Sequence, residues 1–206
     1  MDAELFLYLS LPPCHATYIF TRKSGIPFEL RPVELAPWGE QSQGEHLKPE
    51  FLAAHPRWVG RPLTPPACSV AILLYLSRKY QTEAHWYPPE LQACTRVDEY
   101  LAWQHSAIQQ PATNTYLCKC LLPHFSGQPM DTAQVEQLLG KLMPTLGHLD
   151  QELLASRPLL ASGQVSLADL MALTELMRPS AFGCDLFQDW PRPATRWACV
   201  EAALGL

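Results

Sequence analysis

The chain has 206 residues, so length alone permits one large domain or two small ones. Hydrophobic residues make up 48% and charged residues 17%, which is typical of a packed soluble protein and argues against wholesale disorder. The net charge of −5 and the scattered lysines and arginines give no clustered basic face, so we expect no nucleic-acid partner.

The start of the chain is acidic where a secretory signal would be basic, and no apolar run reaches the ~18 residues of a membrane span. We therefore expect a cytoplasmic protein that does not associate with membranes. Seven cysteines without paired spacing are then expected to be reduced thiols. The Cys118-Lys119-Cys120 pair has no matching His/Cys pair at zinc-ligand spacing, so we expect no metal.

Three elements are predicted in the first 35 residues. Leucines at positions 5, 7 and 9 alternate with other residues, and this period of two indicates a strand. A helix is predicted over 14–24, because Pro13 suits a first helical position and Gly25 suits the stop. Apolar residues over 28–35 suggest a second strand. A strand–helix–strand start is the opening of a small α/β domain.

The remainder of the chain reads as helical after a proline-rich stretch at 36–67 and a linker at 82–89. A buried helix is predicted over 69–80, and helical stripes follow over 91–108, 135–153, 166–178 and 194–204. Pro191 and Pro193 are expected to separate the last two helices. The predicted fold class is therefore an α/β domain followed by an all-α domain.

The clearest local signal is Ser166-Leu167-Ala168-Asp169, which opens a helix. The Ser166 hydroxyl can accept from the N–H of Asp169, and the Asp169 carboxylate can return to the N–H of Ser166, a variant of the capping box. The negative charge also suits the positive end of the helix. Our main interpretation of this pair is a structural cap.

Three stretches together resemble the theta class of cytosolic glutathione transferases. They are Tyr18-Ile19-Phe20, the segment from Leu76-Ser77-Arg78-Lys79-Tyr80 to His85-Trp86-Tyr87-Pro88, and Ser166-Leu167-Ala168-Asp169-Leu170-Met171-Ala172-Leu173. The resemblance implies a thioredoxin-like glutathione-binding domain over 1–81, a linker over 82–89 and an all-helical domain over 90–206. It further implies a homodimer, with glutathione and a small electrophile as co-substrates and no other cofactor.

The resemblance places the residue that stabilises the thiolate of glutathione, a serine in theta enzymes, at Leu11, which cannot donate a hydrogen bond. Ser10 is adjacent, but a shift of one residue on an extended strand turns a side chain to the opposite face unless a bulge re-aims it. Cys14 lies at the start of the first helix, where a thiolate is stabilised. Ser10 and Cys14 are therefore the two catalytic candidates.

The resemblance also implies a set of residues that hold glutathione. In the theta pattern, His46 reaches the glycine end of glutathione, and Arg61 and Pro62 lie in the stretch that carries the cis proline. Cys68 and Ser69 lie at the γ-glutamyl end, where Cys68 replaces an acid of the family. The segment near 60–69 is too short for the usual two-stranded hairpin, which we expect to be missing or stunted. Theta enzymes also continue past the position of Leu206 with helices that cover the site, so we expect an open, truncated helical domain.

Three functional hypotheses follow. The first is a glutathione transferase that conjugates the tripeptide to small electrophiles. The second is a catalytically degenerate paralogue that serves as a binding or dimerisation module, favoured by Leu11, Cys68 and the shortened segment. The third is a thiol-exchange protein that uses Cys14. A Cys14→Ser substitution would spare the first and abolish the third.

Overall fold

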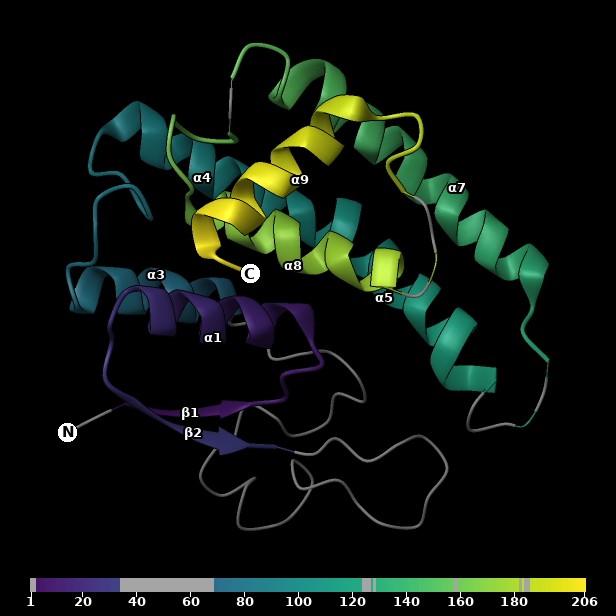
Figure 1. Cartoon of the computed structure of the whole chain (residues 1–206), viewed down its shortest axis with the longest axis horizontal. Coiled ribbons are helices and arrows are strands. Elements are labelled where there is room, and N and C mark those ends of the chain that lie inside the picture. Colours follow the sequence, from purple (N-terminus) through teal and green to yellow (C-terminus); the bar gives the residue numbers. More distant parts are fainter. Residues whose placement is uncertain are drawn as a thin grey trace. The chain divides into compact units, whose positions relative to one another are not determined.

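The computed structural model describes residues 3–33, 69–123, 127, 129–157, 159–181, 183 and 186–206. The chain separates into two compact units, Met1–Tyr80 and Gln81–Leu206. In Figure 1 the first unit holds the strands and the second is built of helices. This order confirms the predicted fold class.

The first unit contains a parallel pair of strands joined through a helix. Strand β1 (Ala3–Leu7) pairs with β2 (Phe28–Pro32), with Leu5 opposite Leu30, and helix α1 (Pro12–Lys23) makes the crossover. Helix α3 (Ser69–Lys79) lies beside α1 on one face of the strands (Figure 1). Leu5 and Leu7 are buried while Phe6 between them is 38% exposed, as a period of two requires.

Two boundaries in this unit differ from the prediction. The helix begins at Pro12 rather than at residue 14, because both prolines fit the first turn, where a missing N–H costs no helical hydrogen bond. Strand β1 ends at Leu7, and Leu9 lies in a turn with 39% of its surface exposed. The Leu11 N–H donates to the Tyr8 carbonyl at 2.9 Å and closes that turn.

The second unit is a helical bundle around α8 (Leu167–Ala181), whose Leu167, Leu170, Met171 and Leu173 are buried. Its other elements in chain order are α4 (Leu91–Gln104), the π-helix η3 (His105–Gln109), α5 (Gln110–Tyr116), the π-helix η4 (Leu117–Leu121), α7 (Thr132–His148), the π-helix η5 (Leu149–Leu153) and α9 (Pro191–Leu204). Leu91, expected on the apolar face of α4, is 78% exposed because the helix starts at that residue.

Prolines occupy helical positions that the sequence did not predict. Pro191 and Pro193 form the first turn of α9 instead of a break before it. Helix α7 continues through Pro144. Pro111 sits in the first turn of α5, directly after the π-helix η3, and such bulges are a known way for a continuous helix to admit a proline.

The predicted linker at 82–89 is fastened to the start of α8. Trp86 is only 4% exposed, and its carbonyl accepts from the Leu167 N–H at 2.9 Å. The Nδ1 atom of His85 bonds to the Val165 carbonyl. These contacts satisfy backbone groups at the N-terminus of α8 that no residue within the helix could satisfy.

Candidate functional site

The two catalytic candidates, Ser10 and Cys14, lie at the N-terminal end of α1, which we call the mouth of α1. Leu11 is the N-cap residue, with extended backbone angles and no side-chain hydrogen bond to the helix. Pro12 and Pro13 have no N–H, so Cys14 supplies the first backbone N–H of α1, and the His15 N–H donates to the Leu11 carbonyl at 2.9 Å. The positive end of the helix dipole lies at this turn and favours a nearby anion.

Ser10 lies in the turn before α1 and is exposed. We expected the Ser10 side chain to face away from the site because we assumed that the strand extends through residue 10. This assumption is wrong, since β1 ends at Leu7. No bulge is therefore needed for its hydroxyl to face a ligand at the turn. Ser10 is the side-chain hydroxyl nearest in sequence to Leu11, which has no donor.

Cys14 is buried in the first turn of α1, with 7% of its surface exposed. A position at a helix N-terminus favours the thiolate, but nucleophilic exchange also requires access from solvent. His15, next to it, is half-buried, and burial lowers the pKa of its imidazole. Above its ordinary pKa range the ring is neutral, so it supplies no positive charge to an anion at this turn.

Of the residues expected to hold glutathione, the structure describes Ser69. It is the first residue of α3 and is buried. His46, Arg61, Pro62 and Cys68 lie outside the described residues, as does the segment in which we expect a missing hairpin. The geometry of the first unit therefore offers two helix N-termini, those of α1 and α3, each with a small polar residue at or just before it.

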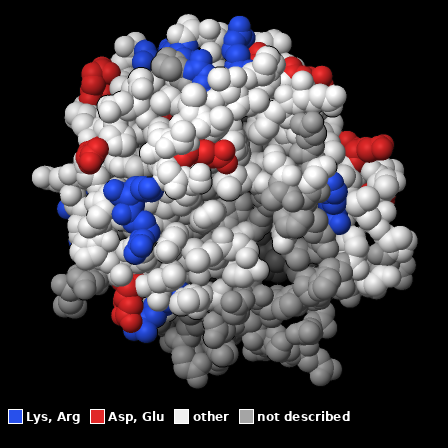
Figure 2. Space-filling model, viewed as in Figure 1, with Lys and Arg blue, Asp and Glu red and all other residues white. Residues whose placement is uncertain are grey.

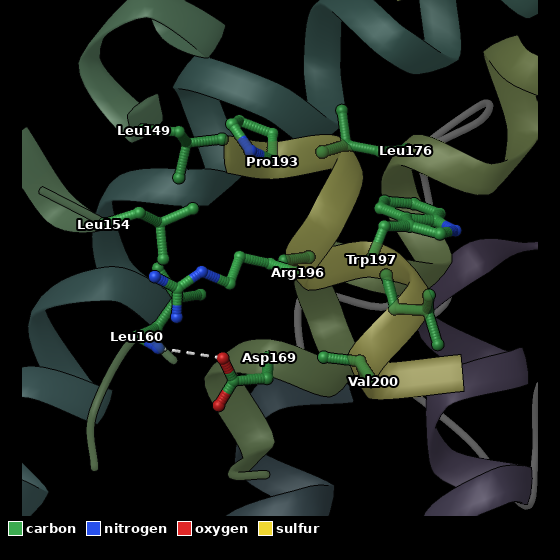
Figure 3. A pocket seen from close by; sticks show the side chains of 11 residues that line it. Leu149, Leu154, Leu160, Asp169, Leu176, Pro193, Arg196, Trp197 and Val200 are labelled. Carbon is green, nitrogen blue, oxygen red and sulfur yellow. Dashed lines mark hydrogen bonds between the residues drawn. The ribbon is translucent and has the colours of Figure 1, made fainter. Parts of the chain in front are cut away.

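The Ser166–Asp169 pair is bonded in a buried cluster at the start of α8. The Asp169 Oδ2 atom accepts from the Ser166 N–H at 2.9 Å and from the Ser166 hydroxyl at 2.6 Å. The hydroxyl thus donates to the carboxylate, whereas the capping-box expectation had it accept from the Asp169 N–H. The Asp169 Oδ1 atom accepts from the Leu160 N–H at 2.8 Å, the bond dashed in Figure 3.

This carboxylate holds two segments together, since it reaches its own helix start and the loop at Leu160. Burial raises the pKa of Asp169, although the three donated hydrogen bonds act in the opposite direction. The sequence could predict the bond to Ser166 from the spacing of three. It carried no signal for the bond to Leu160, nine residues earlier.

A small pocket lies between α8, α9 and η5, and Asp169 is on its wall (Figure 3). Leu149, Leu154 and Leu160 line one side, and Trp197 and Val200 come from α9. The sequence analysis named no residue of this pocket other than Asp169 as functional. Most of its lining side chains are apolar, with Asp169 and Arg196 as the two charged members, so we assign it to the core of the second unit.

On the face shown in Figure 2, lysines and arginines are interspersed with acids. None of the helices in the described ranges is long and apolar enough to cross a membrane. The same ranges contain no cluster of three or more His, Cys, Asp or Glu side chains able to hold a metal ion.

Comparison with known proteins gives the class. The chain matches glutathione S-transferase theta-1 of Bos taurus with 43% identity over 209 residues, covering 100% of this chain and 85% of that protein. It matches human glutathione S-transferase theta-2 with 42% identity over 211 residues, covering 100% of this chain and 83% of that protein. No protein-family model matches the chain.

Solved structures agree. Apo human glutathione S-transferase T1-1 superposes with a TM-score of 0.86 and 41% identity, covering 98% of this chain and 84% of that chain. A human theta-class transferase in complex with the glutathione conjugate of 1-menaphthyl sulfate gives a TM-score of 0.86 and 42% identity, covering 100% of this chain and 83% of that chain. The architecture is thus that of a glutathione transferase, a thioredoxin-like domain followed by a helical one. The chain belongs to the theta class of that family.

Proposed function

We propose that this protein is a glutathione transferase that conjugates glutathione to small electrophiles. The observation that carries the proposal is the match to theta-class transferases, at 42–43% identity over 100% of this chain and 83–85% of those proteins. In the reaction the glutathione thiolate attacks an electrophilic carbon, a C–S bond forms, and the leaving group departs with its electron pair. The thiol proton passes to solvent before the attack.

The mouth of α1 supplies what the thiolate needs in this proposal. The helix dipole and the N–H of Cys14 favour the anion, and the Ser10 hydroxyl at the exposed turn donates to the sulfur. Leu11 provides no donor. Thiolate stabilisation here is therefore weaker than at a site with a serine at position 11.

Ser69 at the start of α3 takes the γ-glutamyl carboxylate, because a helix N-terminus and a hydroxyl both favour an anion. His46, Arg61, Pro62 and Cys68 complete the glutathione site by resemblance to the family. Glutathione is a substrate in this scheme, and the reaction requires no resident cofactor.

Retention on immobilised glutathione, followed by turnover of a chloronitrobenzene-type electrophile, tests the proposal. Retention with elution by free glutathione and measurable conjugation would support it. Ser69→Ala should raise KM for glutathione, whereas Ser10→Ala should lower kcat at neutral pH, because only Ser10 acts on the ionised fraction of the bound thiol. Failure to bind glutathione by retention and by calorimetry would contradict the proposal.

The second candidate is a catalytically degenerate binding or dimerisation module, which Leu11 favours. It predicts a folded protein that conjugates no electrophile at a rate above the uncatalysed one. The third candidate is Cys14-based thiol exchange, which the burial of Cys14 disfavours. A Cys14→Ser variant that keeps full conjugating activity would exclude the third candidate.

A homodimer in the cytoplasm is part of the proposal. The outer face of α3 carries Tyr75, 59% exposed, and Lys79, whose ammonium lies 5.5 Å from the Tyr75 ring centroid and 5.2 Å from that of Tyr80. An exposed tyrosine suits a protein interface, where aromatic side chains are enriched. Light scattering after size-exclusion chromatography should give twice the chain mass, and Tyr75→Asp should shift the protein toward monomer.

A further inference from the structure

Two buried polar side chains of α4 have unsatisfied hydrogen-bonding groups. Tyr100 is 4% exposed and Gln104 is 1% exposed. In the described part of the chain, the Tyr100 hydroxyl and both polar atoms of the Gln104 amide have no hydrogen-bond partner. The two residues are four positions apart on one helix, so their side chains share a face.

That face of α4 packs against α8. Burial raises the pKa of the Tyr100 hydroxyl well above its ordinary value, and the negative charges of Asp169 and Glu175 on α8 raise it further. Both effects keep the hydroxyl protonated. Tyr100 therefore presents an O–H group that can donate as well as accept, next to the acidic side of α8.

Polar atoms in such positions are rarely left without a partner in native proteins. The large majority of buried side-chain polar atoms bond to protein or to ordered water, and globular proteins hold roughly one buried water per 27 residues. An internal water needs two to four polar partners. The Tyr100 hydroxyl and the Gln104 amide, one helical turn apart, offer two of them.

We propose that an ordered internal water molecule binds between α4 and α8, where it bridges the Tyr100 hydroxyl to the Gln104 side-chain amide. The water is a structural ligand. It lets Gln104, the last residue of α4 before the π-helix η3, remain buried at the point where the helix changes its hydrogen-bonding pattern. The proposal does not depend on the transferase activity and can be tested without it.

Thermal unfolding of a Tyr100→Phe variant shows whether the Tyr100 hydroxyl has a hydrogen-bond partner in the folded protein. If the hydroxyl bonds to the water, its removal leaves that water short of a partner, and Tm should fall by about 2–4 °C for a chain of this size. If the hydroxyl has no partner, phenylalanine should leave Tm unchanged or raise it, and the proposal would be overturned. Tyr18→Phe on α1, where the half-buried ring packs edge-on against Phe28, is the matched control and should change Tm much less.

A Gln104→Met variant of similar shape completes the test. Because either substitution disrupts the same water, the double variant should lose less than the sum of the two single losses. A crystal structure of the unmodified full chain provides the direct reading. Density for a water within hydrogen-bonding distance of both side chains would support the proposal. A direct Tyr100–Gln104 hydrogen bond, with no density between α4 and α8, would overturn it even if the variants failed to fold.

Discussion

The Thr145 hydroxyl on α7 donates to the Ala107 carbonyl in η3 at 3.1 Å. In a regular α-helix that carbonyl would accept from the N–H of residue 111, which is proline and has none. The Thr145 hydroxyl thus supplies a donor, from a neighbouring helix, to a carbonyl that has no N–H four residues on. The contact also fixes α7 against the segment that joins α4 to α5.

The first prediction concerns the hydrogen bond from Thr145 to Ala107 and its dependence on Pro111. Thr145→Val keeps the shape of the side chain but removes the donor, so the free energy of unfolding should fall by about 1 kcal/mol. In a Pro111→Ala background the new N–H can bond to Ala107, and the same Thr145→Val change should cost less. Denaturant unfolding of the four proteins in this cycle measures the coupling. Equal losses in both backgrounds would show that Pro111 and Thr145 are not linked.

A second prediction concerns Asp169, which accepts three hydrogen bonds while buried. Asp169→Asn replaces one accepting oxygen with an NH₂ group that faces a donor, so the loss should be about 1–3 kcal/mol. Asp131 caps α7 through one bond to the Gln134 N–H and is exposed, which makes Asp131→Asn the matched control with a smaller loss. Urea midpoints compare the two. Similar losses would mean that the buried bonds of Asp169 contribute no more than one exposed cap.

A third prediction is a pH dependence in the first unit. Burial lowers the pKa of His15 in the folded protein, so the unfolded chain binds more protons between that lowered value and the ordinary value near 6.5. Stability contributed by the neutral ring is full above pH of about 6.5 and is lost as pH falls toward the folded pKa. His15→Gln should flatten this part of the stability profile. An unchanged slope in that variant would assign the dependence to another group.

A fourth prediction concerns position 11. Leu11→Ser places a hydroxyl at the N-cap of α1, where the side chain now makes no hydrogen bond to the helix. A hydrogen bond donated to the bound sulfur lowers the pKa of the thiol, and one pKa unit is about tenfold in the ionised fraction while most of the thiol is protonated, so a gain of about tenfold in conjugation is expected. Leu11→Ala is the control for loss of leucine bulk. A serine variant no faster than the alanine variant would show that position 11 does not face the sulfur.

The sequence predicted elements whose signals are local. The alternation at Leu5 and Leu7, the first helix, and the Ser166–Asp169 spacing depend on neighbours within a few residues, and these patterns located β1, α1 and the start of α8. Element ends were less accurate. Pro191 and Pro193 were read as a break before α9, although the first turn of that helix accommodates them, and the first helix was predicted to start two residues later than Pro12.

Hydrogen bonds between residues far apart in the chain could not be predicted from the sequence. Asp150 accepts from the Arg192 N–H at 3.1 Å and so caps α9 from another helix, 42 residues away in the chain. Thr145 satisfies Ala107 across a separation of 38 residues. The candidate site shows the same limit, because the orientation of Ser10 depended on where β1 ends and could not be derived from residue order alone.

The measurement closest to the central claim is the pKa of the glutathione thiol when bound, followed by ultraviolet absorbance of the thiolate across a pH series. We predict a bound-thiol pKa below that of free glutathione, raised toward the free value by Ser10→Ala and lowered further by Leu11→Ser. Saturating binding with a titration curve that coincides with that of free glutathione would contradict thiolate stabilisation at the mouth of α1.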